Sequence, residues 1–175
     1  MIRRAMPYLI GAAPLFTAFG IAHAEPACVG TISGSTLGDI ARDTPVALER
    51  SHDITESQEL SGAFEQGFRD AGGVVDSGAP ARMIVAYLLH GPAGTPGANQ
   101  TFATLSALTQ ALQAQGGNPR VTLTVTVANF PSGTVVWVGS VVCKIQTRNF
   151  LMLAHDLGGV VARSLGRSMQ DEAIQ

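Results

Sequence analysis

Two histidine–aspartate dipeptides are the residues of this sequence best suited to acid–base chemistry. They are His52-Asp53 and His155-Asp156. A histidine beside a carboxylate can take a proton from water near neutral pH, because the ordinary pKa of histidine is about 6.5. If His52, His155 and Asp156 converge in the fold, they would form the site of a small hydrolase. A hydrolase is therefore the alternative function that we keep for this chain.

The local sequence also explains these residues without catalysis. Asp53 is expected to cap a helix whose third residue is Glu56, and His155 and Asp156 fall near the start of a later helix. The sequence has no H-E-x-x-H, C-x-x-C or H-x-H spacing for zinc and no G-x-S-x-G sequence for a nucleophilic serine. We predict no metal and no cofactor, and we assign no catalytic residue.

Residues 1–24 have the organisation of a cleavable export signal. Arg3 and Arg4 precede an apolar stretch that ends at the small-residue site Ala22-His23-Ala24. The apolar stretch is shorter than the roughly 20 residues that span a bilayer, so we expect no membrane insertion after cleavage. The predicted product is a periplasmic or secreted chain of residues 25–175, folded as one domain.

The cysteine content fits this export. Cys28 and Cys143 are the two cysteines of the chain. In an oxidising compartment an isolated pair favours a disulfide over a metal or redox site, and the alternative is two separate buried thiols. The disulfide would attach the amino-terminal strand to the sheet.

Charge narrows the class of partner. Without residues 1–24 the chain has nine basic and thirteen acidic residues, a formal charge of −4, and no basic run. Nucleic acid and anionic membranes are therefore poor candidate partners. An envelope protein is the partner class that fits export, and the sequence leaves the oligomeric state open.

Periodicity predicts the elements that position these residues. Apolar residues at helical spacing predict helices over 54–71, 101–115 and 150–169. Alternating β-branched residues predict strands over 82–90, 121–128 and 134–146, with short strands near 27–32 and 45–50. The strand 82–90 is apolar on both alternating sets, so we expect cover on both faces for part of its length. These elements predict an α+β two-layer sandwich, with a mostly antiparallel sheet and helices on one face.

Two features are candidates for binding. Trp137 lies in the predicted hairpin, where a lone tryptophan is most often core but can also stack on a ligand. The insert 91–118 combines a proline- and glycine-rich loop with a predicted helix, whose apolar stripe is Phe102, Leu105, Leu108 and Leu112. Long inserts are often functional, so we predict a recognition element here; the alternative is a helix that completes the core.

Three segments together resemble a known family. They are Gly62 to Gly73 (GAFEQGFRDAGG), Ala81 to Tyr87 (ARMIVAY) and Gly133 to Gly139 (GTVVWVG). This pattern resembles small bacterial envelope domains related to the TolB amino-terminal domain and to uncharacterised periplasmic lipoproteins. The likeness covers roughly residues 45–169. It implies a non-enzymatic binding or scaffolding module of the cell envelope, and it transfers no catalytic residue.

Overall fold

The computed structural model describes residues 26–49, 58–90, 99–101 and 119–174. Within these residues the chain forms seven strands and two helices. In chain order they are β1 (Cys28–Thr36), β2 (Val46–Glu49), α1 (Gln58–Asp70), β3 (Ala81–His90), β4 (Asn99–Thr101), β5 (Arg120–Asn129), β6 (Thr134–Ile145), α3 (Phe150–Ser164) and β7 (Met169–Ile174).

The seven strands form one sheet with the order β2-β3-β5-β6-β1-β7, and β4 pairs with the end of β3. Every pairing is antiparallel except that of β2 with β3. The α+β class and the mostly antiparallel sheet are therefore as predicted. The hairpin of β5 and β6 was predicted from its alternating residues, and its turn holds a cis Phe130-Pro131 bond and Gly133 at φ 70°.

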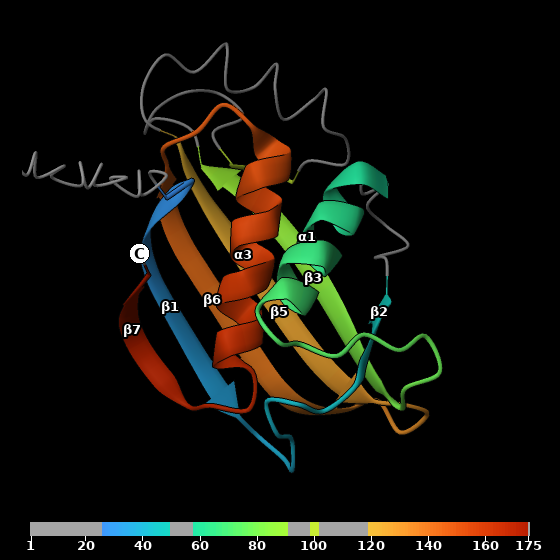
Figure 1. The fold of residues 1–175 in the computed structure, drawn as a ribbon. Helices are drawn as coiled ribbons and strands as arrows, with labels where there is room; N and C mark the ends of the chain where they lie inside the picture. The colour runs from blue at the N-terminus through green and yellow to red at the C-terminus, as the bar shows by residue number, and fades with distance from the viewer. Residues whose placement is uncertain (1–25, 50–57, 91–98, 102–118, 175) are drawn as a thin grey trace, which may run out of the picture.

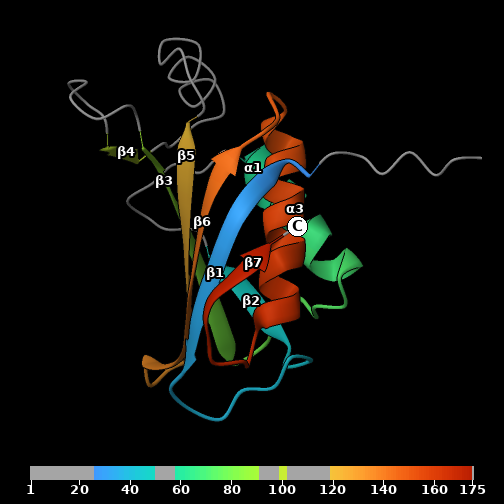
Figure 2. The same cartoon turned by 90° about the vertical axis from the view of Figure 1, so that its left-hand side faces the viewer.

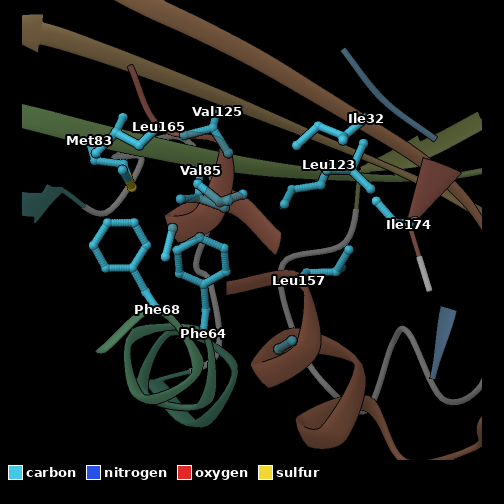
Figure 3. Close-up of a cluster of buried hydrophobic side chains, with 14 of the residues drawn as sticks. Ile32, Phe64, Phe68, Met83, Val85, Leu123, Val125, Leu157, Leu165 and Ile174 are labelled. Carbon is cyan, nitrogen blue, oxygen red and sulfur yellow. The ribbon is translucent and has the colours of Figure 1, made fainter. Parts of the chain in front are cut away.

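Both helices lie on the same side of the sheet in two perpendicular views (Figures 1 and 2). Their apolar stripes meet the inward side chains of the strands, as the close-up of the core shows (Figure 3). Phe64 and Phe68 of α1 and Leu157 of α3 are at most 2% exposed, beside Met83 and Leu123 of the sheet. Burying these large apolar side chains supplies most of the driving force for the fold.

The helices α1 and α3 approach closely because glycines lie at their contact. A Cβ atom built on Gly67 would lie 1.8 Å from the His155 carbonyl oxygen, and one on Gly158 would lie 2.1 Å from the Phe64 carbonyl oxygen. No side chain larger than hydrogen fits at either position without moving a backbone. Asn149 caps α3, since its Oδ1 accepts hydrogen bonds from the amides of Leu151 and Met152.

Three predicted elements differ from the structure. The last helix ends at Ser164 instead of continuing to Met169, because Gly166 turns the chain at φ 75° and Met169 begins β7, a strand that was not predicted. Thr101 was predicted in a helix but lies in β4. The rest of that predicted helix, 102–115, lies outside the described residues.

The third difference concerns β3, which was predicted to be covered on both faces for part of its length. Met83 and Val85 point inward and are buried, whereas Ile84 between them is 38% exposed. Both helices lie on one side of the sheet (Figure 2), and the side chains buried on that side are Met83 and Val85. Two apolar sets in one strand therefore do not require cover on both faces.

Candidate functional site

A solvent-open cavity of about 450 Å³ lies where α1, α3 and the start of β1 meet. It is lined by Pro26, Cys28, Gly67, Asp70, Ala71, His155, Asp156, Leu157, Gly159, Val160, Arg163 and Ile174. Two of the three residues predicted for a hydrolase, His155 and Asp156, are thus brought to one cavity. The third, His52, lies outside the described residues.

His155 is held between two carboxylates. Its Nε2 lies 3.0 Å from Oδ2 of Asp70, and its Nδ1 lies 3.6 Å from Oδ1 of Asp156. The hydrogen bond from His155, helped by one from Gln66, lowers the pKa of Asp70 below its ordinary value. Sequence reasoning missed Asp70, because it lies 85 residues from His155 in the chain and no local pattern links the two.

Asp156 has a structural partner. Its Oδ2 accepts a hydrogen bond of 3.2 Å from the Ala27 amide, and the Ala27 carbonyl accepts one of 2.9 Å from the Gln146 amide. These contacts fix the start of β1 beside α3 and β6. The Asp156 carboxylate is therefore already used to position the backbone.

The cavity has groups for moving a proton but no nucleophile. No serine, threonine, lysine or free thiol is among its lining residues, since Cys28 is bonded to Cys143. Among the described residues, no group of His, Cys, Asp and Glu is arranged to hold a metal ion. What His155 offers there is proton transfer to or from a bound water or ligand.

The disulfide was predicted from the cysteine count and is present. Cys28 and Cys143 are bonded, with their Cα atoms 5.6 Å apart, and the bond joins β1 to the neighbouring strand β6. Both cysteines are buried. Cys28 also lines the cavity, so the disulfide forms part of the cavity wall.

Trp137 has no exposed surface on which a ligand could stack. It is 0% exposed, and its indole Nε1 donates a hydrogen bond of 3.0 Å to the Arg167 carbonyl oxygen. The ring lies over Gly34 and Gly139, a cross-strand pair on β1 and β6. A Cβ atom on Gly139 would lie 2.2 Å from the ring, so this pair of glycines makes room for the indole.

The other predicted binding residues, Phe102, Leu105, Leu108 and Leu112, lie outside the described residues. Their role in recognition stays a prediction. The structure adds one fact about the insert that contains them: β4, at 99–101, pairs antiparallel with residues 88–90 of β3.

The side of the sheet away from α1 and α3 carries a regular array of small uncharged side chains. We call this array the open sheet face, and it consists of three cross-strand rows on β1, β6, β5 and β3. The rows are Thr31, Val142, Thr122 and Leu88; Ser33, Ser140, Thr124 and Ala86; and Ser35, Val138, Thr126 and Ile84. No ionisable side chain is among them.

The open sheet face is accessible in the described part of the chain. Ile84 is 38% and Val142 is 42% exposed. At its β7 margin lies a second cavity of about 530 Å³, whose lining includes Thr124, Ser140 and Asp171. The alternation of Val121 to Val127 was predicted as a strand, but the sequence did not show that its threonines face outward together.

Comparison with known proteins gives the fold distant structural neighbours. No family model matches the chain, and no curated protein matches it. Two structures of the PelC dodecamer from Paraburkholderia phytofirmans are similar, with 18% and 15% identity and TM-scores of 0.43 and 0.44. Each covers 75% of this chain, and the matches take up 93% and 94% of the PelC chains.

A PDZ domain protein from Parabacteroides distasonis is also similar. Its identity is 10% and its TM-score 0.52, and the match covers 83% of this chain but 37% of that protein. At this identity the likeness concerns the fold alone. No helix among the described residues is both long and apolar enough to cross a membrane.

Proposed function

We propose that this chain is a non-enzymatic binding or scaffolding module of the bacterial cell envelope, related to the small envelope domains that its sequence resembles. It acts in the periplasm or outside the cell after loss of residues 1–24, as one two-layer domain. The export pattern and the Cys28–Cys143 disulfide support this location, because disulfides persist in oxidising compartments.

The open sheet face is the observation that carries the binding function. A sheet that packs one face on its own helices usually exposes polar and charged residues to water on the other face. Here the outward rows hold threonine, serine, valine, leucine, isoleucine and alanine, with no charge across four adjacent strands. Depletion of charge is the compositional mark of the centre of a protein interface.

A site-specific crosslink tests this function. A photo-reactive phenylalanine analogue at Thr124, in the middle row, should form a protein adduct in the intact envelope. The same analogue at Gly62 should not, since Gly62 is exposed on α1 and, apart from its chain neighbours and the nearby backbone of its own helix, no atom lies within 4 Å of its Cβ position. A further Ser140→Arg substitution should remove the Thr124 adduct. Equal adducts from both positions, or none from Thr124, would contradict the proposal.

A small extracytoplasmic hydrolase is the second candidate, favoured by the contact of His155 with Asp70 beside a cavity. In this reading His155 takes a proton from water, and Asp70 orients its ring. The purified chain is assayed with nitrophenyl esters and phosphates. Hydrolysis that His155→Ala abolishes while the thermal midpoint is unchanged supports the enzyme, and hydrolysis that is absent or unaffected contradicts it.

A further inference from the structure

We propose that the open sheet face binds the open sheet face of a second copy of this chain, so that two sheets pack face to face with the helices outside. The inference rests on the proposed binding function and names its partner. Four observations on the described residues carry it: the missing charge, the cationic row at one end, the size of the face, and the small side chains.

The missing charge makes the face complementary to itself. Without residues 1–24 the chain has a formal charge of −4, so two copies repel one another over most of their surface. A two-fold interface places the same patch on both subunits, and like charges in it would oppose one another. The rows of the open sheet face hold no ionisable group, and Asp171 at the β7 margin accepts a hydrogen bond from the Ser33 hydroxyl.

A cationic row at one end favours one direction of packing over the other. Next to the row of Thr122 and Val142, the register aligns Val29, Lys144, Arg120 and His90 across the same four strands. Lys144 and Arg120 are exposed, and neither forms an ion pair within the described part of the chain. If the strands of the two copies run in opposite directions across the interface, Lys144 and Arg120 of the two copies lie at opposite ends of the dimer. Each pair then meets the partner end that carries Arg82, whose charge is paired with Glu49 at 3.7 Å.

The size of the face predicts a weak dimer. The three rows occupy about 17 Å of each strand, and the row of Lys144 and Arg120 and the strand ends extend the same side of the sheet to about 30 Å. Four strands of this length, spaced about 4.8 Å apart, present roughly 600 Å² on each copy. The pair would bury about 1,200 Å², which is the lower end of the range for specific interfaces. We therefore expect a dissociation constant on the order of 1 to 100 µM.

The side chains of the array are small enough for two sheets to approach. Packed sheets lie about 10 Å apart, with inner side chains of both interdigitating. The middle row consists of Ser33, Ser140, Thr124 and Ala86, and its hydroxyl groups both donate and accept hydrogen bonds. Hydroxyls from two copies can therefore satisfy one another where the sheets meet.

Sedimentation velocity of the processed protein, purified from its own compartment, tests the inference over 1 µM to 1 mM. The wild type should show a reversible monomer–dimer equilibrium. Thr124→Arg should raise the dissociation constant at least tenfold, because it places two cations close together in a desolvated interface. Ser140→Arg is the second variant, and it should have the same effect if Thr124→Arg folds poorly.

Gly62→Arg is the matched control, since it adds the same charge on the far side of the molecule and should leave the equilibrium unchanged. Near-identical circular dichroism and thermal midpoints establish that the variants are folded. A wild type that stays monomeric to 1 mM overturns the inference, and so does a dimer that Gly62→Arg weakens as much as Thr124→Arg. If the purified chain stays monomeric while Thr124 forms an adduct with a different protein in the envelope, the partner is not a second copy. That result would still support the proposed binding function.

Discussion

Replacing Gly67 with alanine should destabilise the domain, although alanine is the better helix former. The added Cβ would lie 1.8 Å from the His155 carbonyl oxygen and 2.8 Å from its Cα, which are rigid backbone atoms of α3. Alanine gains about 1 kcal/mol over glycine inside a helix. Overfilling a packed contact costs about 1–3 kcal/mol and occasionally more, because the helices must separate.

The same helix provides the matched control. Gly62 lies in α1 five residues earlier, and no atom outside its chain neighbours and the nearby backbone of α1 lies within 4 Å of its Cβ position. In Gly62→Ala the difference in helix propensity between alanine and glycine should therefore be the only effect. It should raise the free energy of unfolding by about 0.5–1 kcal/mol. Gly67→Ala should lower it by up to about 2 kcal/mol, and the two variants should differ by the overpacking cost of about 1–3 kcal/mol.

Urea unfolding followed by fluorescence measures this difference. Trp137 is the single tryptophan and is 0% exposed, so its emission should report global unfolding. For a domain of this size, a difference of about 1–3 kcal/mol corresponds to roughly 2–12 °C in the thermal midpoint. If Gly67→Ala is as stable as Gly62→Ala, the close approach of α1 and α3 is wrong, and with it the geometry that holds His155 beside Asp70.

Three further perturbations test other parts of the structure. Replacing Cys28 and Cys143 together with serine should cost about 4–5 kcal/mol of unfolding free energy by the chain-entropy model, and an unchanged urea midpoint would contradict this. The lowered pKa of Asp70 means that its contact with His155 stabilises the fold above the ordinary aspartate pKa of about 3.9 and is lost as the pH falls through the lowered value. His155→Ala should therefore raise the Asp70 pKa, as carboxyl NMR titration would show, and an unchanged titration would rule out His155 as the main cause. Asn149→Ala should remove the cap of α3 and cost about 1 kcal/mol, whereas Asn149→Asp should not.

The elements that sequence predicted correctly are those whose residues decide their structure locally. A period of two residues runs through Val121 to Val127 and predicts a strand, and the structure has β5 there. A period of about four residues joins Leu60, Phe64 and Phe68 and predicts a helix, and the structure has α1 there. The disulfide was predicted from the number of cysteines and the compartment. None of these required knowledge of the rest of the fold.

The elements that sequence missed depend on contacts between distant residues. Leu165 and Met169 continue the apolar stripe of α3, but both are buried by tertiary packing after the helix has ended. The strand β7 forms because β1 offers it an edge, and its own residues include Asp171 and Glu172, which are poor strand formers. The contact of Asp70 with His155 spans 85 residues and exists only once α1 and α3 have packed.

The two candidate sites differ in how far structure alone explains their residues. Asp156 fixes the Ala27 backbone, and Gly67 sets the distance between the helices beside it. A substitution in this cavity therefore disturbs the fold as well as any activity, so a loss of function there needs an independent measure of stability.

The side chains of Thr124 and Ser140 on the open sheet face are not needed in this way to hold the fold. The strands that carry them are held by backbone pairing and by the valines on the inward side. Threonines between those valines fit a strand, but strand formation alone does not require three adjacent rows free of charge. Lysine or glutamate on an outward row would keep the sheet soluble and protect it from association. A solvated face would be expected to carry such charges, and their absence from all three rows is what a docking surface requires.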